Sequence, residues 1–181
     1  MLVRFTKHPP AAEADLLTCV RADGSTTRCA MPRQGVLPRL ALHFVIEASL
    51  GWHHALFGHI AAGAALDEFT AARSTNERGR NVPLRQAAAL AECLEADLWG
   101  GAVAPADFAP RLQRASRRRG VSPADLTPTT LEQIRTALRG FGAAWRPLAP
   151  GQSLERSFRT TNARVTTRRP RRSQAPVSAR A

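Results

Sequence analysis

The sequence predicts an α+β fold: a small N-terminal antiparallel β-hairpin sheet packed on four to five α-helices. Three observations predict it. Two extended runs flank Asp23-Gly24, residues 37–65 hold most of the apolar mass together with four of the five histidines, and several segments after residue 81 repeat apolar residues at helical spacing. We expect residues 1–158 to form a single domain, which is long enough for a core, and residues 159–181 to form a disordered, Arg-rich tail.

Asp-Gly between two extended runs is typical of a β-hairpin with a two-residue turn. Residues 2–5 predict a preceding strand, and residues 16–21 and 26–31 predict the hairpin strands. With a two-residue loop, the numbers of paired residues add up to about 47. That register places Leu16, Val20, Cys29 and Met31 on one face, and Cys19 and Arg28 on the other. A three-residue loop, the alternative, would bring Cys19 opposite Cys29.

The stretch from Leu37 to Ala65 predicts the central helices of the domain. Its first part is apolar nearly all round, which is typical of a buried helix, and Pro38 suits an early helical position. Gly51 should end or kink this helix, and a second should begin near Trp52. The apolar side of the first comprises Leu37, Leu40, Ala41, Phe44, Val45 and Ala48, and that of the second comprises Trp52, Leu56, Phe57 and Ile60.

Further helices follow along the chain. Residues 67–73 extend the helical region, and residues 74–80 read as a solvated loop. One helix starts near Asn81 and Pro83 and stops at Gly100-Gly101, and the next follows Pro105. Thr129 and Glu132 form a capping-box pattern before the last helix. A final short strand over residues 154–158 would join the N-terminal sheet.

Composition indicates a soluble, cytoplasmic protein. No apolar run reaches the length of about 18 residues that a membrane-spanning helix needs, and the N-terminus lacks the apolar core of a signal peptide. The three cysteines show no metal-binding spacing, which favours a reducing compartment. We therefore expect no membrane contact.

Charge is concentrated in the tail. The net charge is +12, and residues 156–181 hold eight arginines and no acidic residue, so residues 1–155 carry only +4. The arginines of the tail could bind nucleic-acid phosphates weakly and in a salt-sensitive way. The alternative is a solvated tail without a fixed partner. The densest cluster is Arg168, Arg169, Arg171 and Arg172.

Arg39, His43 and Glu47 form a polar stripe on the first central helix, at positions i, i+4 and i+8. Because His43 and Glu47 lie one turn apart, they could share a metal, with His54 as a third ligand, or act as a base and its carboxylate. The alternative is a buried histidine satisfied by Glu47, with Arg39 extending the charge network. The sequence contains no H-E-x-x-H, phosphate-binding glycine loop or G-x-S-x-G motif, so we assign no catalytic residue and no cofactor.

Two segments resemble a family of small, uncharacterised bacterial proteins that carry an R-x-D-G-S hairpin and a P-H-D-L-x-H-x-x-V-E helix. The matching residues are Arg21-Ala22-Asp23-Gly24-Ser25 and the run from Met31 to Pro38, leading into His43 and Glu47. Arg39 and Leu40 stand where the family has His and Asp. The likeness covers about residues 1–65, and it implies a fold rather than an activity.

The sequence leaves the function open among three hypotheses. We expect first a non-enzymatic cytosolic binding or accessory domain with a protein partner. The second is a metal-dependent hydrolase, or a degenerate relative of one, that uses His43 and Glu47. The third is a weak nucleic-acid binder that acts through the Arg-rich tail.

Overall fold

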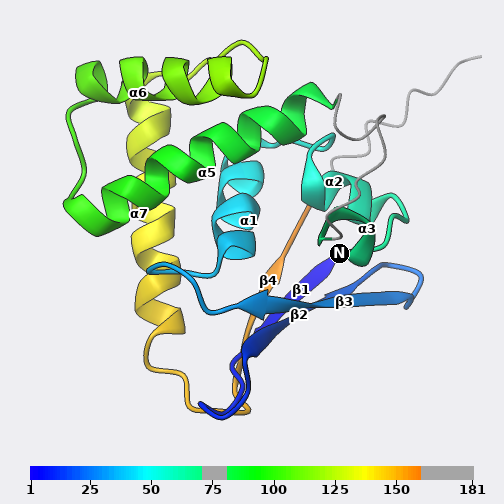
Figure 1. Cartoon of the computed structure of the whole chain (residues 1–181). Coiled ribbons are helices and arrows are strands. Elements are labelled where there is room, and N and C mark those ends of the chain that lie inside the picture. The colour runs from blue at the N-terminus through cyan, green and yellow to red at the C-terminus, as the bar shows by residue number, and fades with distance from the viewer. Residues whose placement is uncertain (71–80, 160–181) are drawn as a thin grey trace, which may run out of the picture.

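The computed structural model describes residues 1–70 and 81–159, and its fold is α+β. Four antiparallel strands form one sheet in the order β3-β2-β1-β4 (Figure 1). The predicted C-terminal strand does join the N-terminal sheet, because it pairs with the first strand along its whole length. The strands are β1 (Leu2–Thr6), β2 (Ala14–Val20), β3 (Thr26–Pro32) and β4 (Ser153–Ser157).

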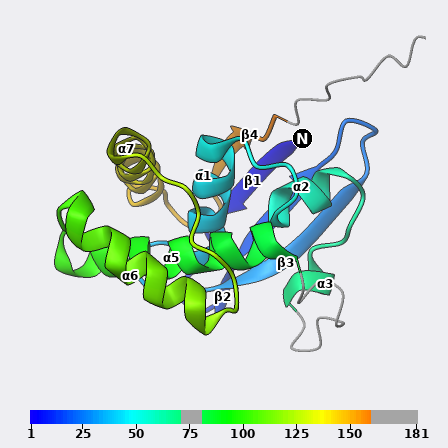
Figure 2. The ribbon, with the colours of Figure 1, turned by 90° about the horizontal axis from the view of Figure 1, so that it is seen from above.

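The helices gather on one side of this sheet (Figures 1 and 2). Helix α1 (Arg39–Leu50) contacts α2 (Leu56–Ala61), α5 (Val82–Gly100) and α7 (Pro128–Trp145). Helix α6 (Pro105–Arg118) packs on the outer side of α5. The short helix α3 (Asp67–Thr70) follows α2 in the chain.

The hairpin between β2 and β3 forms, but in a different register from the predicted one. Cys19 pairs with Thr27 and Leu17 with Cys29, so paired numbers add up to 46. The predicted faces were therefore wrong: Cys19 and Cys29 share the inner face, and Cys19 does not lie opposite Cys29 as the alternative proposed. On the inner face with them are Leu17 and Met31, whereas Leu16, Val20 and Arg28 belong to the outer face.

The turn explains this register. Arg21 N donates to Ser25 O at 2.9 Å, which closes a three-residue loop ending at Gly24 with φ +82°. A two-residue Asp-Gly turn needs positive φ at both residues. Asp23 instead keeps negative φ, and its carboxylate accepts hydrogen bonds from Ser25 N and Oγ at 2.9 and 2.7 Å. The Asx-type hydrogen bonds thus favour the longer loop.

The core lies between the inner face of the sheet and α1. Phe44 stands at its centre, with ring centroids 5.7 Å from Phe5 of β1, 5.4 Å from Phe57 of α2 and 6.1 Å from Phe158 after β4. The contacts with Phe5 and Phe57 are edge-to-face, an arrangement that adds to the stabilisation from burial. One aromatic cluster therefore joins the sheet to two helices and to the C-terminal strand.

Local signals placed most helix ends. Gly51 ends α1 with φ +63°, and the Asn81 side chain caps α5 by accepting from Leu84 N at 2.8 Å. Two expectations were wrong: α2 begins at Leu56 instead of near Trp52, and Thr127, not Thr129, caps α7 by accepting from Thr130 N. Pro128 occupies the first helical turn of α7, which moves the cap one residue before it.

Some expectations lie outside the described residues or stay predictions. Residues 71–73 of the expected helix, the loop at 74–80 and the tail from residue 160 are outside. The domain boundary near residue 158 stays a prediction. In the described ranges, no helix has both the length and the apolar composition to cross a bilayer.

Burial of the inner-face thiols predicts a pH effect on stability. Burial, with a contribution from nearby Cys29, raises the pKa of Cys19 from 9.0 to about 12. Because the folded state keeps the Cys19 thiol protonated more strongly than the unfolded state does, the thiol stabilises the fold fully below pH 9. As pH rises from 9 toward 12, the free energy of unfolding falls by up to about 1.4 kcal/mol per pH unit. Chemical unfolding at several pH values should therefore show a flatter decline above pH 9 for Cys19→Ala. The outer-face control Thr18→Ala should keep the original slope. Equal slopes for Cys19→Ala and the unaltered chain would show that the Cys19 thiol does not cause the decline.

Candidate functional site

The predicted pair His43 and Glu47 does come together on α1. His43 Nδ1 lies 3.8 Å from Glu47 Oε1, and both side chains are buried. Glu47 is fully enclosed, and its oxygens accept hydrogen bonds from Leu56 N at 3.1 Å and Phe57 N at 2.7 Å. These are backbone amides of the first turn of α2, whose donors have no partner inside the helix. Glu47 thus acts as a cap that ties α2 to α1.

The rest of the predicted stripe does not join this pair. Arg39 is exposed at the start of α1, and it forms no ion pair with Glu47 in the described structure. His54 is exposed in the connection between α1 and α2. Within residues 1–70 and 81–159, no three His, Cys, Asp or Glu side chains gather as metal ligands. The four arginines of the predicted nucleic-acid site, Arg168, Arg169, Arg171 and Arg172, lie outside the described residues.

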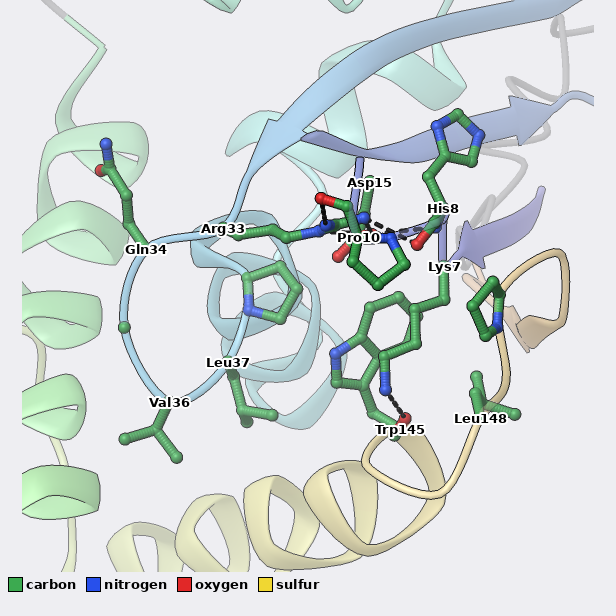
Figure 3. A pocket seen from close by; sticks show the side chains of 13 residues that line it. Lys7, His8, Pro10, Asp15, Arg33, Gln34, Val36, Leu37, Trp145 and Leu148 are labelled. Carbon is green, nitrogen blue, oxygen red and sulfur yellow. Dashed lines mark hydrogen bonds and ion pairs between the residues drawn. The ribbon is translucent and has the colours of Figure 1, made fainter. Parts of the chain in front are cut away.

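A pocket that the sequence did not predict lies where the sheet meets the end of α7 (Figure 3). Its volume is about 400 Å³, within the range typical of small-molecule sites. Three connections build it: the segment after β1, the loop from β3 to α1, and the turn after α7. The lining includes Lys7, Pro10, Asp15, Arg33, Trp145 and Leu148.

Asp15 and Arg33 form one wall. Arg33 Nε and Nη2 donate to Asp15 Oδ1 at 3.1 and 2.9 Å, and the same oxygen accepts from His8 N at 2.9 Å. Arg33 Nη2 also donates to the carbonyls of His8 and Pro9. These hydrogen bonds, drawn as dashed lines in Figure 3, hold the wall in place without a ligand.

Lys7 and Trp145 form the opposite part of the lining. Lys7 Nζ lies 5.6 Å from the centroid of the Trp145 ring and donates to Arg146 O at 2.9 Å, with a longer contact of 3.5 Å to Trp145 O. Both carbonyls belong to the C-terminal end of α7, where a cation is favourable. The lysine consequently rests on an aromatic surface beside the cavity.

A second buried charge pair, also missed in the sequence, joins α5 to α7. Arg135 Nη2 donates to Asp97 Oδ2 at 2.5 Å and to Val103 O at 2.8 Å, and Arg135 Nη1 donates to Glu132 Oε1 at 2.6 Å. Asp97 and Arg135 side chains are each 5% exposed. Glu132, expected in a capping box, thus supports this ion pair instead. The pair fixes the helices relative to each other.

The pocket could have been suspected from one signal. Asp15 lies at an inner-face position of β2, where the neighbouring alternate residue is the fully buried Leu17. A buried carboxylate needs partners, so a nearby arginine is expected. The sequence could not show which arginine would pair with Asp15, or that Trp145 would complete the pocket, because these residues are far from Asp15 in the chain.

Comparisons of this chain with protein-family models, with curated proteins and with solved structures find no match. The resemblance to the small bacterial proteins therefore rests on the residues quoted above. The site is interpreted from its own geometry.

Glu47→Gln tests whether the His43–Glu47 pair serves the fold. The amide can accept only one of the two backbone hydrogen bonds and would leave Leu56 N or Phe57 N unpaired, so we expect a loss of about 2–3 kcal/mol in the free energy of unfolding. Arg39→Gln, on the same helix but exposed, should change it by less than about 0.5 kcal/mol. Denaturant unfolding measures both. A Glu47→Gln variant of normal stability that loses bound metal would instead support the metal hypothesis.

Proposed function

We propose that this chain is a binding or accessory domain whose ligand site is the pocket between the sheet and the end of α7. The observation that carries the proposal is the combination in that pocket of a preformed polar wall, a cation on an aromatic ring and an apolar remainder. Ligand sites in proteins combine an apolar lining with a few fixed polar groups in this way. A cytosolic location and a protein partner belong to the same proposal.

The distribution of satisfied groups supports this choice of site. At the histidine-rich helix, both oxygens of Glu47 are taken up by backbone amides in the core. At the pocket, the side chain of Arg33 is 33% exposed, and within residues 1–70 and 81–159 its Nη1 makes only a long contact of 3.4 Å to Pro10 O. Donors that remain accessible beside a cavity can bind a ligand. Buried groups that are already paired serve mainly to hold the structure.

A fragment library tests the proposal. Fragments that bind should shift the amide resonances of residues 7–10, 33–38 and 145–150 together in two-dimensional NMR spectra, because these segments form the lining. Leu148→Trp places a larger side chain in the lining and should weaken such binding by about tenfold or more, the scale of a lost pocket contact.

The matched control is Val82→Trp, at an aliphatic residue that is 45% exposed at the start of α5. It should leave binding unchanged. Fragments whose shifts scatter over the surface, or whose affinity is the same in both variants, would rule out the pocket as the site. Turnover of any fragment would show that the protein is an enzyme and not an accessory domain.

Nucleic-acid association is the second candidate, and the charge of the chain favours its assignment to the tail. In the described part, Arg118 and Arg119 at the end of α6 both pair with Glu92, with Arg119 Nη2 at 2.6 Å from Oε2. Burial opposes ionisation of Glu92, but the hydrogen bonds and charges of both arginines outweigh it and lower the pKa of the carboxyl. This pairing reduces the cationic character of the helix end. Residues 156–181, by contrast, hold eight arginines and no acidic residue.

The tail is tested by comparing the full chain with a chain that ends at Phe158. Affinity for an arbitrary DNA duplex should fall steeply with salt for the full chain and be nearly lost after truncation, because phosphate contacts release counterions. Fluorescence anisotropy over a salt series measures both. Equal affinity of the two chains would exclude the tail.

A further inference from the structure

The pocket has features that select a ligand class, and this inference rests on the proposed function. We infer that it binds a small carboxylate with a compact apolar body. Three properties of the lining lead to this: its net charge, its accessible donors, and its size and apolar surface.

The charge of the lining favours an anion of low charge. Lys7 and Arg33 contribute two positive charges and Asp15 one negative charge, so these side chains leave a net charge of +1. A cationic ligand would be repelled by Lys7 and Arg33, because Asp15 neutralises only Arg33. A dianion such as a phosphate monoester would meet the Asp15 carboxylate with only one compensating charge. A single carboxylate matches the lining.

Donors remain for that carboxylate. An ammonium group has three N–H bonds, and the carbonyls of Trp145 and Arg146 account for at most two of those of Lys7. The Nη1 group of Arg33 has two N–H bonds and only the long contact to Pro10 O. Hydrogen bonds between these charged groups and a carboxylate are the strong kind. Both donors can therefore contact the acid group.

The rest of the lining determines the body of the ligand. Leu37, Pro38, Leu148 and Pro150 add apolar surface to the lining. Leu37 and Leu148 lie on either side of Trp145 in Figure 3. The volume of about 400 Å³ is near the lower end for small-molecule sites, so one ring fits better than an extended chain. Benzoate, with one ring and one carboxylate, is a suitable probe.

The experiment compares benzoate with its neutral isostere benzamide on the full chain at pH 7. NMR titration follows the indole N–H resonance of Trp145, assigned by its loss in Trp145→Phe, while Trp99, which is 69% exposed and outside the lining, serves as the internal reference. Benzoate should shift the Trp145 resonance with a millimolar Kd, and it should bind about fivefold or more tightly than benzamide, as expected for a charge-assisted hydrogen bond.

Variants test whether Lys7 binds the carboxylate of benzoate. Lys7→Met should cut benzoate affinity about fivefold or more and leave benzamide affinity unchanged, whereas Lys7→Arg, which keeps the cation, should stay within about threefold of the original. Arg28→Gln removes the same charge from an exposed position on the outer face of β3 and controls for general electrostatics. If Lys7→Met does not fold, the benzoate–benzamide comparison on the unaltered chain still shows whether the pocket selects a carboxylate.

Two outcomes would overturn the inference, and they differ in what they say of the proposed function. Equal affinities for benzoate and benzamide at Trp145 would show that the pocket binds ligands without selecting a carboxylate, and the proposed function would survive. No shift of Trp145 with either probe would exclude small carboxylates. The fragment screen and the Leu148→Trp variant would then decide separately whether the pocket binds other small molecules.

Discussion

The fold depends on the need to bury α1 on nearly every side. Residues 41–47 of this helix are all buried, and no single layer can cover a helix whose apolar surface extends so far round. The sheet covers one side, while α2, α5 and α7 cover others. This requirement explains why strands from both ends of the chain share one sheet and why Phe44 contacts β1, α2 and the residue after β4. It also explains why Glu47, the acidic residue of α1, must be satisfied inside the core.

Charged side chains satisfy backbone groups at the places where elements end. Arg21 donates to Ile60 O and Ala64 O at 2.6 Å each, near the end of α2, and Glu47 accepts from the start of the same helix. Lys7 does the same for the end of α7, and Arg33 for the segment after β1. Unpaired backbone groups at helix ends are costly when they are partly buried, so these hydrogen bonds stabilise the fold. The R-x-D-G-S residues, which suggested a resemblance, therefore have a structural role in this chain: Arg21 anchors α2, and Asp23 and Ser25 shape the turn.

The sequence predicted the parts of the fold that depend on local patterns. Helical periodicity located α1, α5, α6 and α7, and the alternation around the turn located β2 and β3, because apolar spacing and glycine conformation are properties of short segments. The hairpin register was wrong by one residue, since it depended on whether Asp23 would adopt positive φ or accept hydrogen bonds from Ser25. The two-residue reading misassigned the faces of Cys19 and Leu16 for this reason. The pocket was missed because its walls come from residues near 7, 33 and 145, whose meeting is decided by the packing of α7 and β4 and not by any local pattern.

The contrast between the predicted and the observed site lies in how Glu47, Lys7 and Arg33 use their hydrogen-bonding groups. His43 and Glu47 looked reactive in the sequence because a histidine and a carboxylate one turn apart are a common chemical pair. In the structure the carboxylate accepts two backbone hydrogen bonds in a fully buried position, and a ligand that displaced them would also have to release α2 from α1. Lys7 and Arg33 are cations that also bond to backbone carbonyls, yet each keeps N–H groups at the edge of a cavity. A ligand can add to those interactions without breaking them. Spare hydrogen-bonding capacity beside open volume, more than the identity of the residues, is therefore the reason to place ligand binding at the end of α7.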